Sequence, residues 1–149
     1  MKLRLLVVGR GASELADFEA RFIKRIKAYA EVDVIELAEG RGKQAEQRQQ
    51  EEARHILRRA GKGFILFDEK GQVLDSRKWS TFLGRLPGNR SLDFVIGGAD
   101  GVNDEVRQAA AHVWSLSMLT LPHQLARILV LEQLYRAFTI QQGHPYHRA

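Results

Sequence analysis

The sequence predicts an α/β fold in which a mostly parallel sheet is flanked by helices. Short apolar runs of strand length alternate along the chain with segments whose apolar residues recur every three or four positions. The first of these runs, residues 3–8, is apolar except for Arg4, as is typical of a strand buried on both faces. Strands separated by helices need crossover connections, so we expect helices on both faces of the sheet.

The first half of the chain is expected to form two strands and two helices. Residues 3–8 and 32–37 are the strands. Between them Ser13 is expected to cap a helix. The inner face of this helix carries Leu15, Phe18, Phe22 and Ile26, and its outer face is basic, with Arg21, Lys24, Arg25 and Lys27. Residues 44–60 are rich in Gln, Glu and Arg and predict a second helix, lying mostly in solvent and ending at Gly61.

The same alternation continues in the second half. Residues 64–67 are the third strand, which is expected to turn at residues 68–71. A helix follows, marked by Trp79, Phe82, Leu83 and Leu86. Residues 92–96 form the fourth strand and enter a glycine loop at 97–101, after which Asn103 is expected to cap a helix at 104–111. Residues 113–118 are the fifth strand, 123–140 a long helix, and 141–149 a polar tail.

Composition narrows the possible functions. A chain of 149 residues fits one domain, residues 1–149. It has no cysteine and therefore no disulfide or thiolate metal site, and no run approaches the roughly 18 apolar residues of a membrane span, so the cytoplasm is the expected location. The formal net charge of +5, carried mostly by residues 1–62, favours a polyanionic partner such as nucleic acid.

Two glycine-bearing loops are candidate ligand sites, because ligands of parallel sheets bind beyond the carboxyl ends of the strands. The loop at residues 97–101 follows a buried strand and lets a ligand approach the backbone closely, although such a turn can also be purely structural. The loop at Gly9 and Gly11, with Glu36 near the end of the next strand, is a weaker match to a dinucleotide site. Glu14 stands where the third glycine of that motif would be.

Two further segments have unusual compositions. Residues 116–122 continue apolar beyond the fifth strand, so they either pack under another element or line a pocket for a flat apolar group. The tail at residues 145–148 concentrates Tyr146, His147 and Arg148, whose side chains can stack on a base and hold a phosphate. His144 and His147 are spaced as a possible metal pair, but no third ligand accompanies them, and no metal is expected.

Four strings resemble the RlmH family, the ribosomal large-subunit pseudouridine methyltransferases. They are Phe-Val-Ile-Gly-Gly-Ala-Asp-Gly at 94–101, Ser-Leu-Ser-Met-Leu-Thr-Leu-Pro-His at 115–123, Glu-Gln-Leu-Tyr-Arg-Ala at 132–137 and Pro-Tyr-His-Arg at 145–148. The resemblance implies a SPOUT-class fold with a C-terminal trefoil knot and a homodimer. It also implies N3-methylation of a pseudouridine in 23S rRNA, within assembled ribosomes, with S-adenosylmethionine as cofactor.

The resemblance also implies which residues form the site. The cofactor pocket would use Phe67, Gly97, Leu116, Ser117, Met118, Leu119, Thr120 and Leu121. Phe67 stands where comparable members have leucine, and Met118 where smaller residues such as alanine occur. The catalytic candidates are Tyr146 to position the base, His147 as a proton acceptor and Arg148 to stabilise the anionic ring.

The residues alone leave the roles within the tail open, and two other functions stay in play. One is a Rossmann-like NAD-dependent oxidoreductase, and the other is a non-catalytic module that binds RNA or the ribosome.

Overall fold

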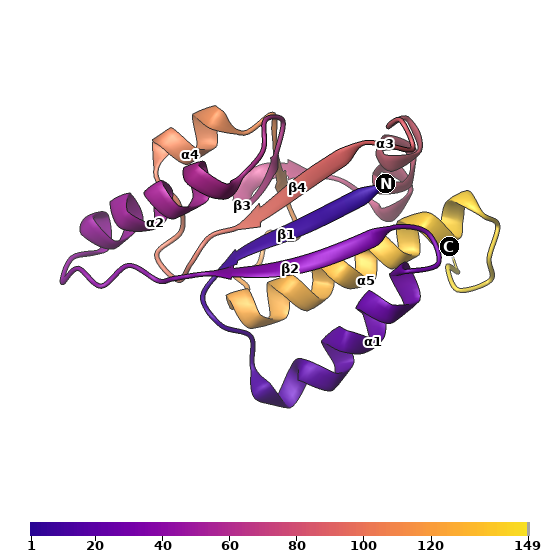
Figure 1. Cartoon of the computed structure of the whole chain (residues 1–149), viewed down its shortest axis with the longest axis horizontal. Coiled ribbons are helices and arrows are strands. Elements are labelled where there is room, and N and C mark those ends of the chain that lie inside the picture. Colours follow the sequence, from indigo (N-terminus) through magenta and orange to yellow (C-terminus); the bar gives the residue numbers. More distant parts are fainter. Residues whose placement is uncertain (149) are drawn as a thin grey trace.

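A parallel sheet of five strands forms the middle layer of the protein, in the order β2-β1-β4-β3-β5. The structure is a computed structural model that describes residues 1–148 (Figure 1). Every pairing in the sheet is parallel, which confirms the predicted α/β class. The strands are β1 Lys2–Val8, β2 Glu31–Leu37, β3 Ile65–Val73, β4 Ser91–Ile96 and β5 His112–Ser115.

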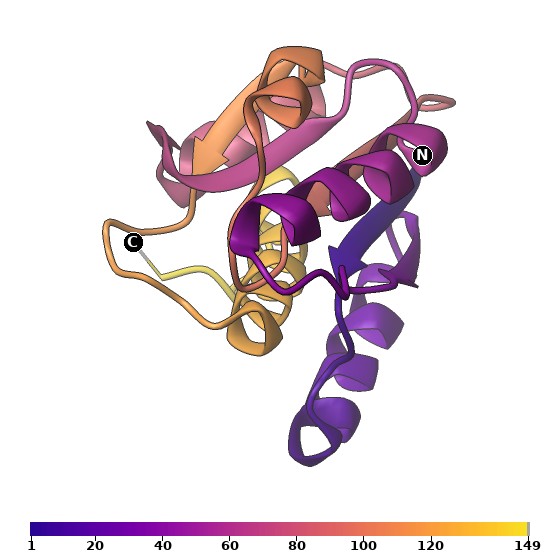
Figure 2. The ribbon, with the colours of Figure 1, turned by 90° about the vertical axis from the view of Figure 1, so that its left-hand side faces the viewer.

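Helices cover both faces of the sheet, as Figures 1 and 2 show. Helices α1 (Ala16–Ile26), α3 (Ser76–Gly84) and α5 (His123–Gln141) share one apolar core with the sheet. Helices α2 (Ala45–Arg59) and α4 (Asp104–Ala109) form a second core on the opposite face. Strand β1 is apolar from Leu5 to Val8 because it serves both cores: Leu3, Leu5 and Val7 belong to the first, and Leu6 and Val8 to the second.

The ends of two helices test the capping predictions. Asn103 caps α4 as expected, because its Oδ1 accepts the backbone N–H of Val106 at 3.2 Å. The prediction that Ser13 caps the first helix is wrong. Ser13 lies within a short 3-10 turn, Ser13–Leu15, that precedes α1, and α1 begins at Ala16 with no side-chain cap. The hydroxyl of Ser13 is thus inside the helical segment and not in front of it.

Strand β3 differs most from the sequence prediction. A turn was expected at residues 68–71, but β3 continues to Val73 through an irregularity in which Phe67 and Gln72 both pair with Trp114 of β5. Such a bulge turns side chains away from the regular alternation. The bulge requires glycine at position 71, since a Cβ there would lie 2.7 Å from backbone atoms of Val113 and Trp114.

Strand β5 is shorter than predicted and ends at Ser115, so residues 116–118 belong to the following loop. Two serine hydroxyls redirect the chain at this point. Ser115 Oγ donates to the carbonyl of Ser117 at 2.8 Å, and Ser117 Oγ accepts the backbone N–H of Leu119 at 3.0 Å. These local bonds compete with further strand pairing.

Across residues 1–148, no helix has both the length and the apolar character that crossing a membrane would require.

Candidate functional site

A cavity of about 760 Å³ opens at the carboxyl ends of β3, β4 and β5, beside the first turn of α5. The wall is formed by the bulge of β3 at residues 68–70, the glycine loop at 97–102, the loop after β5 except Met118, and residues 122–124 and 126 at the start of α5. The volume lies within the usual range of small-molecule sites. All but one of the residues that the resemblance assigns to the cofactor line it, namely Phe67, Gly97, Leu116, Ser117, Leu119, Thr120 and Leu121.

Met118 is the exception. Its side chain is 91% exposed and does not line the cavity, although it lies between two residues that do. The local hydrogen bonds of Ser115 and Ser117 turn the chain at this point, and Met118 lies on the outside of the turn.

Several polar residues of the cavity wall were not selected from the sequence, among them Asp68, Glu69, Arg107 and His123. Arg107 Nε donates to Asp68 Oδ2 at 3.0 Å, which ties α4 to the bulge of β3. Thr120 Oγ1 donates to Glu69 Oε2 at 3.1 Å, which ties the loop after β5 to the same bulge. The acidic pair follows a buried strand, the position at which ligand contacts are expected, but its composition is also that of a surface turn.

The glycine loop is shaped by contacts inside the protein. A Cβ at Gly97 would lie 2.6 Å from Cγ1 of Val102, so this position excludes a side chain before any ligand is considered. Gly101 has a φ of 75°, and its backbone N–H donates to the carbonyl of Gly98 at 3.0 Å. The loop therefore closes as a tight turn whose backbone borders the cavity.

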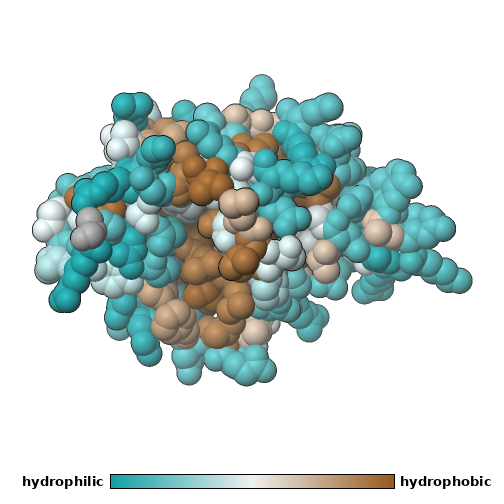
Figure 3. Space-filling view, turned by 180° about the vertical axis from the view of Figure 1, so that it is seen from behind, coloured by the Kyte–Doolittle hydropathy of each residue, from teal (hydrophilic) through white to brown (hydrophobic). Residues whose placement is uncertain are grey.

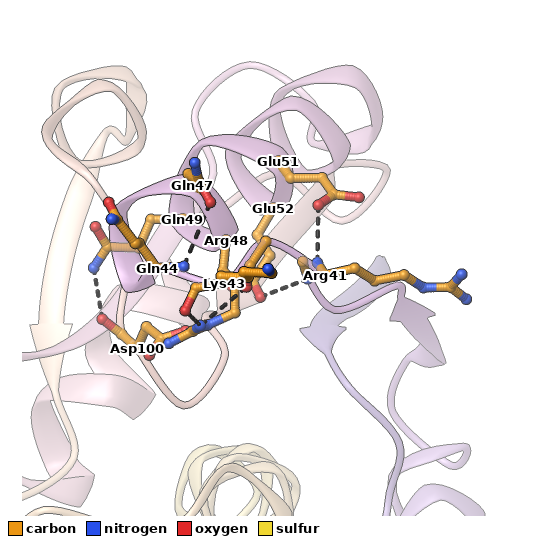
Figure 4. Close-up of polar contacts among 11 residues, drawn as sticks. Arg41, Lys43, Gln44, Gln47, Arg48, Gln49, Glu51, Glu52 and Asp100 are labelled. Carbon is orange, nitrogen blue, oxygen red and sulfur yellow. Dashed lines mark hydrogen bonds and ion pairs between the residues drawn. The ribbon is translucent and has the colours of Figure 1, made fainter.

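Helix α2 holds the glycine loop at Asp100 (Figure 4). Arg48 donates to both carboxylate oxygens of Asp100, at 2.7 and 3.0 Å, and Gln49 Nε2 donates to its backbone carbonyl at 2.6 Å. The bidentate bond from Arg48 lowers the pKa of the Asp100 carboxyl below its ordinary value. Asp100 is thus a fixed, ionised group at the rim of the cavity.

The C-terminal tail folds back onto the second half of α5. Tyr146 Oη donates to Glu132 Oε2 at 3.1 Å, and the ring of Tyr146 packs edge-on against Tyr135 with centroids 4.7 Å apart. The guanidinium of Arg136 lies 4.9 Å from the centroid of the same ring. Glu132 and Arg136 form the ion pair expected from their spacing, with Nη2 and Oε2 3.0 Å apart. Burial and the negative charge of Glu132 raise the pKa of the Tyr146 hydroxyl, so it keeps its proton.

Arg136 also determines which nitrogen of His147 carries a proton. Arg136 Nη1 lies 3.2 Å from His147 Nδ1, and a guanidinium can only donate. The Nδ1 atom must therefore accept, which leaves the proton of the neutral ring on Nε2. Nε2 is buried and has no hydrogen-bond partner within residues 1–148. Arg148 is exposed.

Within one chain the tail and the cavity are far apart. The cavity touches α5 no further along than Ala126, whereas the tail is held at Glu132 and Arg136, six and ten residues later. At a rise of about 1.5 Å per residue, this separates them by roughly 9 to 15 Å along the helix. Figure 1 shows the C-terminus beside the far end of α5, away from where that helix begins.

The face seen from behind carries an apolar band between hydrophilic regions (Figure 3). Large apolar side chains are left exposed on the loop after β5 and on the first half of α5: Met118 is 91% exposed, Leu119 70%, Leu125 44% and Leu129 40%. Contiguous apolar surface of this kind marks an interaction site.

The loop after β1 is already filled by the protein's own side chains. Glu36 Oε2 accepts the backbone N–H of Gly11 at 2.7 Å, and Arg127, only 4% exposed, binds both Glu36 and Glu19 at 2.7 Å. These bonds lower the pKa of Glu36 and keep a negative charge where a dinucleotide would place its pyrophosphate. The strand order also differs from that of the Rossmann fold.

The histidines of the tail lie apart from any acidic or histidine cluster. His144 Nδ1 accepts the backbone N–H of Tyr146 at 3.1 Å. Among the residues that the structure describes, no group of three or more His, Cys, Asp or Glu side chains could hold a metal ion.

Comparison with known proteins finds similarity to methyltransferases over nearly the whole length of the chain. A family described as "Predicted SPOUT methyltransferase" matches residues 1–147. Proteins named "Ribosomal RNA large subunit methyltransferase H" are 43% identical in Rhizobium meliloti (strain 1021), covering 100% of both chains, and 44% identical in Rhizobium leguminosarum bv. trifolii (strain WSM2304), covering 99% of both.

Among solved structures, a probable methylase family protein from Haemophilus influenzae Rd KW20 aligns with a TM-score of 0.54 at 14% identity. The alignment covers 95% of this chain and 66% of that one. At this identity the likeness concerns the fold alone.

Proposed function

This chain belongs to the SPOUT methyltransferase family, among relatives named ribosomal RNA large subunit methyltransferase H, and from that premise we propose that it methylates 23S rRNA of the large ribosomal subunit. The finer assignment is N3 of a pseudouridine, with S-adenosylmethionine as cofactor, in a single SPOUT-type domain with a C-terminal trefoil knot. The observation that carries the proposal is the cavity at the carboxyl ends of β3 to β5, which is built mostly from the strings that resemble this family.

The residues of the cavity fit S-adenosylmethionine. Phe67, Leu116 and Leu121 offer an apolar wall for a flat ring, and the glycine loop offers backbone without side chains. Glu69 and the ionised Asp100 place negative charge near a cofactor whose sulfonium and ammonium groups are positive. When bound, this cofactor supplies a methyl group for an in-line displacement. The task of the protein is to align N3 and exclude water.

We infer that the working enzyme is a homodimer. The cavity lacks the tail of its own chain, and the tail holds side chains suited to a base and its phosphate. A second copy, docked on the apolar surface of Met118, Leu119, Leu125 and Leu129, would bury that surface and bring its own tail to the cavity. A closed two-fold dimer is the commonest arrangement of identical chains.

The arrangement of the tail favours stabilisation of an anion over proton abstraction by a side chain. Tyr146 keeps its proton and donates it to Glu132, which fixes the tyrosine ring, and His147 carries a proton on Nε2 that no other group of residues 1–148 accepts. Once Nε2 meets the substrate it can donate a hydrogen bond, while Arg148 adds a positive charge. N3 of the ring loses its proton to solvent. The negative charge then spreads to the flanking carbonyl oxygens, where donors and a cation stabilise it.

The substrate is expected to be the assembled ribosome, which places the enzyme in the cytoplasm. The net charge of +5 supports binding to RNA, and the outer face of α1 exposes Arg21, Lys24 and Arg25.

Nothing in the arrangement favours an oxidoreductase, because the loop after β1 is occupied by Glu36 and Arg127. A purely RNA-binding module would have no need of the cavity.

Nucleoside mass spectrometry of 23S rRNA tests this function. Ribosomes from a strain lacking the gene should lack one N3-methylated pseudouridine, and the purified protein with S-adenosylmethionine should restore it. Restoration without added cofactor, or an unchanged nucleoside profile in the deletion strain, would contradict the proposal. Titration calorimetry should detect binding of S-adenosylmethionine and none of NADH. The opposite preference would favour the oxidoreductase.

A further inference from the structure

Helix α2 reaches the glycine loop through one buried carboxyl group. Glu52 is 4% exposed, and its Oε2 accepts the backbone N–H of Gly40 at 2.8 Å. Its other oxygen, Oε1, is buried without a hydrogen-bond partner in the part of the chain that the structure describes. A buried polar atom without a partner costs free energy, so its presence calls for an explanation beyond the stability of α2.

Oε1 of Glu52, the atom without a partner, faces the glycine loop at residues 97–101. A Cβ at Gly98 would lie 2.9 Å from Oε1 of Glu52 and 3.0 Å from Cγ1 of Val8. The carboxyl group therefore packs directly against the backbone of Gly98, which also lines the cavity. Any side chain at position 98 would displace Glu52 or move the loop.

Glu52 acts together with the hydrogen bonds of Arg48, which lies one turn earlier on the same helix. Arg48 precedes it by four residues and therefore lies on the same face of α2. Arg48 holds Asp100 and also donates to the carbonyls of Gly42 and Lys43 at 3.0 Å. Figure 4 shows that this face of α2 joins the loop after β2 to the glycine loop after β4.

We propose that Glu52 is a positioning residue for the glycine loop. Its carboxyl group fixes Gly98 on one side and Gly40 on the other, in the arrangement that S-adenosylmethionine binding requires. That the ligand is S-adenosylmethionine rests on the function proposed above. The positioning of the glycine loop is independent of that function, because it follows from contacts within the free protein.

A neutral side chain of the same shape should serve as well as the native one. Burial raises the pKa of Glu52, and the negative charges of Asp100 and Glu39 raise it further, while the hydrogen bond from Gly40 and the charge of Arg48 oppose them. Glutamine keeps an oxygen for the N–H of Gly40 and fills the same space. Alanine leaves both loops without the contact.

Hydrogen exchange of the free protein tests the positioning directly. In Glu52→Ala, amides of residues 97–102 should exchange at least about tenfold faster than in the native protein, whereas Glu52→Gln should restore slow exchange. Glu51→Gln is the matched control. Glu51 accepts the N–H of Arg41 at 2.9 Å in the same loop after β2, but unlike Glu52 it is not among the atoms that a Cβ at Gly98 would meet. Unchanged exchange in a folded Glu52→Ala protein would overturn the proposal.

Calorimetric titration with S-adenosylmethionine then tests the consequence for binding. Affinity should fall about tenfold or more in Glu52→Ala and stay native in Glu52→Gln and Glu51→Gln. If the native protein binds no S-adenosylmethionine while the exchange result holds, the proposed function fails and the positioning role stands. If Glu52→Ala does not fold, Gly98→Ala probes the contact from the other side. Native exchange and native affinity in Gly98→Ala would overturn the proposal.

Discussion

The two ring nitrogens of His147 have different tasks because Arg136 can only donate. Arg136 fixes Nδ1 as an acceptor and so leaves a donor at Nε2. Glu132 holds Arg136 in turn and also accepts from Tyr146, so one ion pair orders two residues of the tail. The spacing of Glu132 and Arg136 predicts an ion pair along the helix and nothing more, because spacing cannot show that a tail returns to it.

The donor role of His147 predicts an order among its substitutions. Glutamine can present an N–H near the position of Nε2, whereas alanine cannot. Neither side chain can act as a base. His147→Gln should therefore keep a larger part of the methylation rate than His147→Ala, with a difference of about tenfold or more, the size typical of one lost donor to a developing anion. Single-turnover methylation of ribosomes measures this difference. Equal loss in both variants would indicate that His147 is the proton acceptor.

At the scale of secondary structure, the strands and helices were predictable because each has a strong apolar pattern. The exceptions share one cause. Asp68, Glu69 and Gly71 have the composition of a turn, yet β3 continues through them because the backbone of β5 lies close enough to pair with Gln72 and Val73. Likewise α2 was expected to lie mostly in solvent, and its polar sequence conceals the buried carboxyl of Glu52. Tertiary contacts decided both cases, and composition does not record them.

The bulge of β3 makes Gly71 sensitive to the smallest substitution. In Gly71→Ala the added methyl group would meet the backbone of Val113 and Trp114 at 2.7 Å, and backbone cannot move aside as a side chain can. We expect a loss of about 1 to 3 kcal/mol in the free energy of unfolding, together with weaker cofactor binding because Glu69 moves with the bulge. Urea unfolding and calorimetry measure the two effects. As a control, Gly88→Ala should be nearly neutral, since nothing lies within 4 Å of a Cβ there.

The buried carboxyl of α2 predicts a dependence of stability on pH. Because the pKa of Glu52 is raised in the folded protein, the folded state binds the proton more tightly than the unfolded state. Stability from this group is present at low pH and is lost as the pH rises from the ordinary glutamate range through the raised value. The thermal midpoint of Glu52→Gln should therefore match the native one at low pH, exceed it increasingly as the pH rises through the raised pKa, and then exceed it by a constant amount. A difference that is the same at every pH would show that folding does not shift the pKa of Glu52.

At the scale of the whole molecule, the sequence could identify two groups of residues but not whether they meet in one chain. The strings at 97–101 and 116–121 do come together, because parallel strands end at the same edge of a sheet. The tail does not join them, because it packs on α5 at Glu132 and Arg136, beyond the first turn of the helix that borders the cavity (Figure 1). A site that uses both groups therefore needs two copies of the chain.

This requirement predicts complementation between two inactive proteins. One variant lacks residues 145–149 and keeps its cavity. The other, Thr120→Trp, keeps its tail but fills the cavity from an exposed position on its wall. Each should fold, form dimers and lack methylation activity. Random exchange makes about half of the dimers mixed, and each mixed dimer has one intact site of two, so about a quarter of native activity should appear. If the tail instead acted on the cavity of its own chain, no mixture would regain activity, because no chain holds both parts.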